Sequence, residues 1–146
     1  MRSFRGAALW AQPAGPRFSG LRGEQLVFDA ERKRVKELGF DESRVVWTAR
    51  SNRTADHDIK SAHEDGGDLW IEVKATTGRD GRFPWSIAEF GKAAREQDRY
   101  ELWRVYEASS NAPSFKKFPN PVSMHENKKV KLELASFWAE VEPMNG

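Results

Sequence analysis

The 146-residue sequence has no cysteine, and this absence excludes disulfide scaffolds, thiol catalysis and zinc sites built on cysteine. It also lacks any apolar run close to the ~18 residues that a membrane-spanning helix needs. No apolar segment of the secretory type follows the N-terminus, so we do not expect a secreted precursor. Together these absences favour an intracellular, cytoplasmic protein that does not enter a membrane.

A large excess of one charge is also missing, because 24 Lys and Arg residues face 22 Asp and Glu residues, for a net charge of +2. The distribution is uneven along the chain. Four arginines precede the first acidic residue, Glu24, so the remainder is slightly acidic. A protein of this kind would bind nucleic acid through a local basic patch and not through a globally basic surface.

The sequence does contain many aromatic residues, with nine Phe, six Trp and two Tyr. These side chains bury large areas and argue against disorder, although 32% of the residues are charged. The length suits one domain. Residues 1–20, rich in Gly and Pro, are predicted to be a flexible arm or linker, and residues 21–146 the folded domain. An Arg-rich start also suits an organelle transit peptide, but an ordinary tail or the edge of a longer protein is favoured.

Residues 21–38 are predicted to form a helix that ends at Gly39. At about 100° per residue, one face of this helix carries an apolar stripe of Val27, Phe28, Val35 and Leu38. Glu24 lies at the centre of that stripe, and burying a carboxylate is costly unless it is paired or binds a cation. On this pattern alone the ordinary explanation is favoured, in which the helix dipole stabilises a Glu in the first turn.

Residues 44–50 and 69–74 are predicted to be strands, because both are rich in β-branched and aromatic side chains. A glycine-containing turn at 65–68 would join the second of them to the preceding segment as a hairpin. Alternation along 69–74 places Glu72 and Lys74 on one face, roughly 6–7 Å apart along the strand. Ordinary surface ion pairs have the same spacing.

Residues 86–97 are predicted to form a second helix, since Ser86 and Glu89 have the spacing of a capping box. Residues 100–106 are predicted to be a further strand. The proline-containing residues 111–127 are predicted to be a loop, and residues 128–139 are open between strand and helix.

The chain thus offers, in order, an acidic residue on a helix, an aspartate at the start of a strand, and a Glu-x-Lys triplet on the next strand. This order resembles the PD-(D/E)xK nuclease superfamily, more closely its Mrr-like branch, and within that branch the C-terminal domain of NO VEIN-type proteins. The resemblance covers roughly residues 20–107 and is carried by His57-Asp58-Ile59, Ile71-Glu72-Val73-Lys74-Ala75-Thr76, the loop into Phe83, Ser86-x-x-Glu89 and Tyr100-x-Leu102-x-Arg104-Val105. It implies an α/β fold of the restriction-endonuclease-like type, with a mixed central β-sheet flanked by helices.

The resemblance also implies metal-dependent hydrolysis of DNA phosphodiester bonds, with Mg²⁺ or Mn²⁺ as the cofactor. Asp58 and Glu72 offer the hard oxygen ligands that Mg²⁺ prefers, and the carbonyl of Val73 would complete the ligand set. Lys74 would orient the attacking water or stabilise charge in the transition state. By the same resemblance, Glu24 becomes a further catalytic candidate that supports the metal or its water.

Departures from the family pattern leave some alternatives open. His57 precedes Asp58 where relatives often have Pro or Gly, and Asp56 competes with Asp58 for the role of metal ligand. We favour Asp58, and His57 is a candidate to support the metal ligands, although surface histidines are common. By resemblance Glu89 is an auxiliary residue that positions the nucleophile or the substrate, whereas its capping-box role alone explains it.

Basic residues that border the catalytic face are the candidates for contacts with nucleic-acid phosphates. The first group consists of Arg79, Arg82, Lys116 and Lys117, and the second of Lys128, Lys129 and Lys131. Phe83 and Trp85 are candidates for stacking on bases, although packing in a core is the commoner role of such residues.

The predicted function is therefore a metal-dependent DNA endonuclease of restriction or phage defence, either alone or as part of a larger multidomain protein. Cutting both strands would favour a homodimer. One rival is a catalytically inactive nucleic-acid-binding or sensing module on the same fold. The other is a protein-interaction domain whose acidic cluster is incidental. The choice between DNA and RNA, the strand and sequence or modification preference, and the oligomeric state all stay open.

Overall fold

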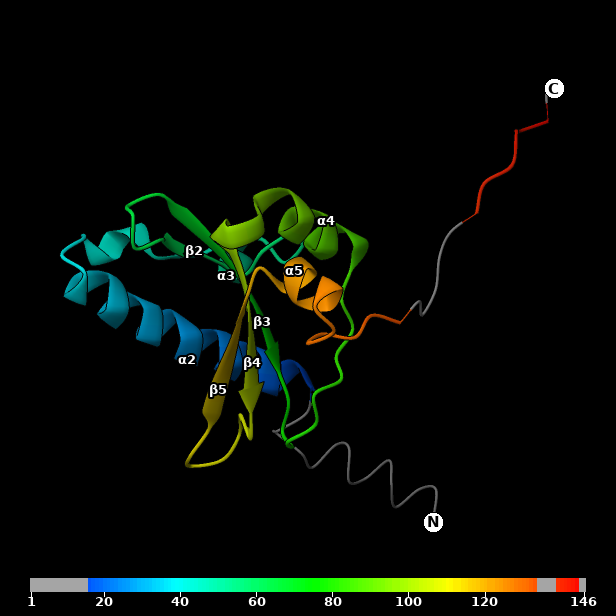
Figure 1. The fold of residues 1–146 in the computed structure, drawn as a ribbon. Coiled ribbons are helices and arrows are strands. Elements are labelled where there is room, and N and C mark those ends of the chain that lie inside the picture. Colours follow the sequence, from blue (N-terminus) through cyan, green and yellow to red (C-terminus); the bar gives the residue numbers. More distant parts are fainter. Residues whose placement is uncertain (1–15, 134–138, 145–146) are drawn as a thin grey trace, which may run out of the picture.

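One mixed sheet of five strands forms the centre of the fold (Figure 1). The computed structural model of the chain describes residues 16–133 and 139–144. The strands lie side by side in sequence order and are β1 (Val46–Trp47), β2 (Ile59–Ala62), β3 (Asp68–Ala75), β4 (Tyr100–Tyr106) and β5 (Ser114–Pro119). β3 and β4 are parallel, whereas all other neighbours are antiparallel. The predicted α/β class with a mixed central sheet is therefore confirmed.

Helices cover both faces of this sheet. α2 (Pro16–Glu37) packs on one face, and α4 (Ile87–Glu96) and α5 (Pro121–Glu126) lie on the other (Figure 1). The short helical turns η1 (Glu42–Arg44), α3 (Thr48–Ser51) and η2 (Gln97–Arg99) lie between the longer elements. Within the described ranges, no helix combines the length and the apolar character that crossing a membrane requires.

The buried face of α2 follows the predicted stripe for most of its length. Val27 and Val35 are fully buried in the core, and Phe28 packs against it while remaining partly exposed. The prediction for Leu38 is wrong, because 43% of this residue is exposed. The helix has ended one residue earlier, and the chain turns away at Gly39, which has a φ of +90°.

The N-terminal part of α2 comes very close to β3. The helix begins at Pro16, inside the segment predicted to be an arm, while residues 1–15 of that segment lie outside the described residues. A Cβ atom at Gly23 would lie 2.7 Å from the Cβ of Ala75, so only glycine permits this approach. The approach brings the next residue of the helix, Glu24, against the sheet.

The predicted hairpin is confirmed, with β2 and β3 antiparallel and Ile59 opposite Ile71. Its turn includes Gly66 at a φ of +90°, a conformation that favours glycine. Alternation along β3 sets Leu69, Ile71 and Val73 on the α2 face and Trp70, Glu72 and Lys74 on the α4 face.

The strand predicted at 44–50 is wrong except at Val46 and Trp47, since Arg44 ends the helical turn η1 and Val45 caps it. Only Val46 and Trp47 pair with β2, and residues 48–51 form the helical turn α3. The amide of Ala49, which is buried, donates to the carbonyl of Asp58, so the chain folds over the start of β2. Tertiary contacts have overridden the local β preference of this segment.

The loop predicted at 111–127 is also wrong, because this segment contains β5 and α5. Both elements tolerate their prolines. β5 lies at an edge of the sheet and ends in Pro119, and Pro121 takes the first turn of α5 behind the capping side chain of Asn120. In the open segment 128–139, residues 128–133 form no strand or helix, and residues 134–138 lie outside the described residues.

Candidate active site

The candidate site lies at the point where β2 and β3 diverge, between Asp58 and Val73, and we call this point the fork. Asp58 immediately precedes β2, and its amide donates to the carbonyl of Ile71. Its side-chain Oδ2 accepts a 2.8 Å hydrogen bond from the amide of Val73. The N–H and C=O of one residue point to the same edge of a strand, so the carbonyl of Val73 faces the side on which Asp58 lies. The predicted ligands Asp58 and Val73 are therefore neighbours at the open end of the hairpin.

Glu72 and Lys74 occupy the α4 face of β3 beside this fork. Glu72 is almost fully buried, at 2% exposure. The Nζ atom of Lys74 lies 3.3 Å from Glu72 Oε2 and 2.9 Å from Glu89 Oε1. Lys74 therefore bridges two carboxylates from different elements and connects the strand to α4.

Glu89 makes two kinds of contact in the structure. The predicted capping box is confirmed, since Ser86 accepts from the amide of Glu89 and Glu89 accepts from the amide of Ser86. The same Oε1 atom accepts from Lys74. The helix cap thus holds Glu89 in place against the lysine.

Burial and mutual repulsion shape the titration of the two carboxylates. Burial, and then the charge of Asp58, raise the pKa of Glu72 far above its usual range. Burial also raises the pKa of Asp58, which the Val73 amide opposes and the charge of Glu24 reinforces. For Lys74, burial disfavours the ammonium, but the carboxylates of Glu72 and Glu89 outweigh burial and raise its pKa. The site therefore concentrates more negative charge than its one lysine neutralises.

Glu24 projects from α2 and is buried, with 4% exposure, but its carboxylate is already paired. The guanidinium of Arg53 spans both oxygens at 3.1 and 3.2 Å, and the indole of Trp47 donates to Oε1 at 2.8 Å. Glu24 is still close enough to Asp58 to raise its pKa. Among residues 16–133 and 139–144, no group of three or more His, Asp or Glu side chains is arranged to hold a metal ion.

The two aspartates that compete for the role of metal ligand have different partners. Asp56 accepts from His57 Nδ1 at 2.9 Å and lies 3.6 Å from Arg95. Burial disfavours its charge, but the bond to His57 and nearby cations lower its pKa overall. Asp58 instead contacts Val73 and is coupled to Glu72.

His57 braces the segment in front of Asp58. Its Nε2 atom pairs with the hydroxyl of Thr48 at 2.9 Å, and its ring meets the edge of Trp70 with centroids 4.8 Å apart. Both ring nitrogens of His57 are therefore bonded to residues outside the fork, and His57 stabilises the segment that precedes β2.

Two polar groups near the site were not predicted. Tyr100 is fully buried on the α4 face of β4, and its hydroxyl has no hydrogen-bond partner among the described residues. Burial, and then the nearby charge of Glu72, raise the pKa of Tyr100. The Nε1 atom of Trp85 is also buried, with no hydrogen-bond partner in the described part of the chain, although the sequence suggested Trp85 only for stacking or packing. Neither the Tyr-x-Leu pattern of β4 nor the loop composition signals these positions.

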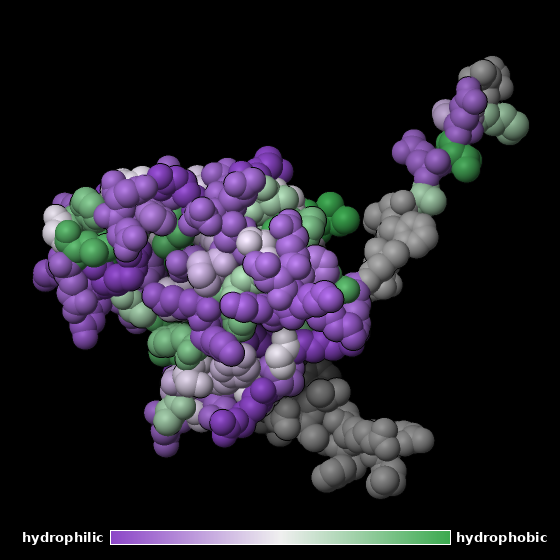
Figure 2. All heavy atoms as spheres, viewed as in Figure 1, coloured by the Kyte–Doolittle hydropathy of each residue, from purple (hydrophilic) through white to green (hydrophobic). Residues whose placement is uncertain are grey.

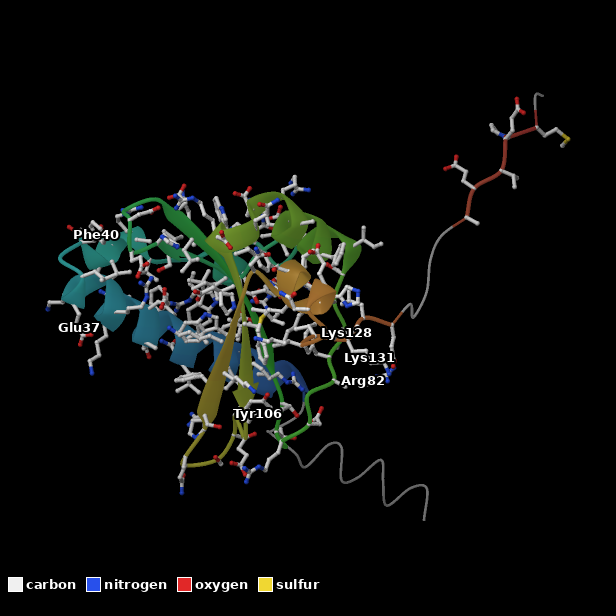
Figure 3. The ribbon with its side chains drawn as sticks, viewed as in Figure 1. Glu37, Phe40, Arg82, Tyr106, Lys128 and Lys131 are labelled. Carbon is white, nitrogen blue, oxygen red and sulfur yellow. The ribbon has the colours of Figure 1, made fainter. Side chains whose placement is uncertain are left out.

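The predicted phosphate contacts lie in two places. Arg79 and Arg82 are exposed in the loop after β3, where Arg82 pairs with Glu133 at 2.9 Å. This loop is anchored by Arg104, which is buried and donates to the carbonyls of Asp80 and Arg82. Figure 3 shows Arg82 with Lys128 and Lys131 on the side of the molecule next to α5.

Lys116 and Lys117 are exposed on β5, and alternation sends them to opposite faces of the sheet. Lys116 pairs in register with Arg104 on the Lys74 face, whereas Lys117 lies over the ring of Trp103 at 4.3 Å. The structure therefore separates these two lysines from each other. The face drawn in Figure 2 is mostly hydrophilic, with only scattered hydrophobic residues.

Comparison with known proteins gives one match. The sequence model of the family described as Protein NO VEIN, C-terminal, matches residues 23–118. This range includes α2 from Gly23 onward, the fork, α4 and most of β5. No curated protein and no solved structure matches the chain.

Proposed function

The chain belongs to the NO VEIN C-terminal family, and from this membership and the acidic fork at Asp58 and Glu72 we propose that it is a metal-dependent endonuclease of the PD-(D/E)xK type. The mixed five-stranded sheet is consistent with a restriction-endonuclease-like fold. The order of the key residues along the chain, with Asp58 before the hairpin and Glu72-x-Lys74 on its second strand, supports the same proposal.

One observation carries the proposal. Glu72 Oε1 is buried and has no hydrogen-bond partner among the described residues, although a second carboxylate, Asp58, lies beside it. An arrangement that buries two neighbouring carboxylates is costly unless a cation compensates them. Lys74 alone does not, because it is shared with Glu89.

The donor set suits a hard divalent cation. Asp58 and Glu72 supply carboxylate oxygens and Val73 a carbonyl oxygen, which are the ligand types that Mg²⁺ and Mn²⁺ prefer. When bound, such an ion would supply a water of lowered pKa and positive charge beside the scissile phosphate. We assign Glu24 a supporting role, because its oxygens are engaged by Arg53.

The side chains around the fork have distinct tasks in this proposal. Lys74 stays an ammonium between two carboxylates and stabilises the negative charge that develops on the phosphate. Glu89 holds the Lys74 ammonium in position, and the hydrogen bond from Val73 fixes the carboxylate of Asp58. Arg79, Arg82 and Lys116 are the proposed contacts to the phosphates of DNA, whereas Lys117 lies on the opposite face of the sheet.

We place this activity in restriction or phage defence, with the domain acting alone or within a larger protein. Cutting both strands of a duplex would require two such sites, which a homodimer supplies.

Plasmid nicking tests the proposal directly. Supercoiled DNA is incubated with the full chain and Mg²⁺ or Mn²⁺, beside the Glu72→Gln and Lys74→Met variants. We expect metal-dependent nicking by the wild type and a loss of about 100-fold or more in each variant. In parallel, Mg²⁺ should raise the melting temperature of the wild type and not that of Glu72→Gln. Equal nicking by all three proteins would overturn the proposal.

A second candidate is favoured by the contact between Arg53 and Glu24, which occupies a carboxylate that the family uses at the metal. In this alternative the domain binds nucleic acid without cutting it. Its signature is a DNA affinity that decreases steeply with salt, together with no nicking in either metal.

A further inference from the structure

Three polar atoms around the fork are buried without a hydrogen-bond partner among the described residues. They are Glu72 Oε1, the hydroxyl of Tyr100 and Nε1 of Trp85. Folded proteins rarely leave such atoms unpaired, because the hydrogen bonds that each makes to water in the unfolded chain are then not replaced. The presence of three such atoms near one site indicates that these groups act together.

Tyr100 and Glu72 are neighbours across two strands. β3 and β4 are parallel, with Trp70 opposite Tyr100 and Glu72 opposite Leu102, so Tyr100 and Glu72 are diagonal neighbours on the same face. Glu72 is close enough to raise the pKa of the Tyr100 hydroxyl. Both side chains are almost fully buried.

Trp85 approaches the same hydroxyl from the crossover segment before α4. Its indole is close enough to lower the pKa of Tyr100, partly opposing the effect of burial, but the two atoms do not meet hydrogen-bond geometry. The indole ring also packs against Phe90, whose ring meets it at 81° with centroids 5.2 Å apart. The Tyr100 hydroxyl is therefore close to both Trp85 and Glu72.

The hydrogen-bonding capacities of the three groups allow only one order of donors and acceptors. An indole N–H only donates, a phenol both donates and accepts, and an ionised carboxylate only accepts. We propose that Trp85 and Tyr100 are positioning residues that form a hydrogen-bond relay, in which Trp85 donates to the Tyr100 oxygen and Tyr100 donates to Glu72 Oε1. This inference rests on the proposed function, because the relay acts on a residue assigned to the metal.

The relay fixes the orientation of the Glu72 carboxylate. Lys74 already holds Oε2 at 3.3 Å, and a bond from Tyr100 to Oε1 restrains the second oxygen. Each carboxylate oxygen has two lone pairs, so both remain able to bind a cation. Hydrogen bonds to a ligating carboxylate typically change metal affinity by about 10- to 100-fold.

The test combines a metal titration with a spectroscopic signature. The ¹⁵N-labelled full chain is titrated with Mg²⁺, and the indole N–H signal of Trp85 is assigned with Trp85→Phe. The key variant is Tyr100→Phe, which keeps the buried ring and removes only the hydroxyl. The matched control is Tyr106→Phe, because Tyr106 is the other tyrosine of the chain and lies at the opposite end of β4 (Figure 3).

In the wild type and in Tyr106→Phe, we expect Mg²⁺ to move the Trp85 signal downfield as the relay closes. In Tyr100→Phe, that signal should stay in place, and the Mg²⁺ concentration for half-saturation should rise about 10-fold or more. Without added metal the melting temperature of Tyr100→Phe should not decrease, because the lost hydroxyl had no partner.

The outcomes separate the two proposals. If Mg²⁺ does not bind the wild type, the proposed function and the relay both fail. If Mg²⁺ binds the wild type and Tyr100→Phe equally, the relay alone is overturned. A lower melting temperature with unchanged Mg²⁺ affinity would assign Tyr100 a purely structural role and would also overturn it. Should Tyr100→Phe not fold, the Mg²⁺ affinity of Trp85→Phe decides in the same way.

Discussion

The amide of Val73 donates a 2.8 Å hydrogen bond to the carboxylate of Asp58, at the position where β2 would otherwise supply a backbone acceptor. The two strands of the hairpin separate at this point, and a side chain takes the place of the next rung of the ladder. The carboxylate of Asp58 therefore has two properties that can be separated. Its oxygen accepts the hydrogen bond from the Val73 amide, and its negative charge lies beside Glu72.

Substitution of Asp58 should separate these properties. Asp58→Asn keeps an oxygen for the Val73 amide and removes the repulsion with Glu72, so we expect an unchanged or higher melting temperature and no stabilisation by Mg²⁺. Asp58→Ala leaves the amide without its acceptor and should lower the free energy of unfolding by about 1–3 kcal/mol. Urea denaturation with and without Mg²⁺ measures both. Equal destabilisation by Asn and Ala would mean that the charge itself holds the fork.

Arg53 should limit the affinity of the site for a cation. Its guanidinium spans both oxygens of Glu24, and its charge also acts on Asp58 and Glu72. Arg53→Ala removes one positive charge from the site and frees Glu24, so we expect Mg²⁺ to bind several-fold more tightly. Isothermal titration calorimetry measures the change.

The matched control for Arg53 is Arg50→Ala. Arg50 lies in α3, three residues before Arg53, with its guanidinium over the ring of Trp47 at 5.3 Å. Among the described residues, the hydrogen bonds to Glu24 come from Arg53 and Trp47 and not from Arg50. Its loss should leave the affinity for Mg²⁺ unchanged. Weaker binding in Arg53→Ala alone would show that Arg53 supports the site and does not oppose the cation.

The features of the fold that depend on local pattern were predictable from the sequence. The hairpin follows from alternation and a glycine turn, and the capping box follows from the three-residue spacing of Ser86 and Glu89. The strand of residues 114–119 was not predicted, since its prolines are tolerated only because the strand lies at an edge. Whether a strand lies at an edge is decided by the whole sheet and not by its own residues.

Parts of the candidate site could also be predicted from the sequence, and others could not. Asp58, Glu72 and Lys74 were predicted as a set from their order, and Glu24 from its place on the buried stripe of α2. The partner of Glu24 was not predicted, because Arg53 is 29 residues away in the sequence and reaches it only through the folded turn α3. Tyr100 was expected as a strand residue that carries the family resemblance and not as a site residue, because its proximity to Glu72 depends on the parallel register of β3 and β4.

The stability of the protein without metal should decrease as the pH rises. Burial, and then Asp58, raise the pKa of Glu72, so above the ordinary carboxyl range the folded chain binds more protons than the unfolded chain. By linkage, the free energy of unfolding then decreases with increasing pH. Glu72→Gln cannot lose a proton there and should flatten this slope. Urea denaturation with a chelator at about pH 5, 7 and 9 measures it, and equal slopes for both proteins would contradict the prediction.

The approach of α2 to β3 should make Gly23 intolerant of a side chain. In Gly23→Ala the new Cβ would lie 2.7 Å from that of Ala75, and neither atom has a rotatable bond with which to move away. The helix must then shift, and we expect the free energy of unfolding to decrease by about 1–3 kcal/mol. The displaced helix also carries Glu24, so the binding of Mg²⁺ should change as well.

Gly20 provides the matched comparison for this helix. It lies one turn earlier in α2, and a Cβ atom there would meet nothing within 4 Å. Gly20→Ala should therefore stabilise the chain by about 0.5–1 kcal/mol, through the better helix propensity of alanine. Opposite signs in the two variants, measured by urea denaturation, would show that the contact with β3 outweighs helix propensity at Gly23. If both variants were stabilised equally, the close approach would not constrain α2, and the position of Glu24 would have to be set by its bonds to Arg53 and Trp47 alone.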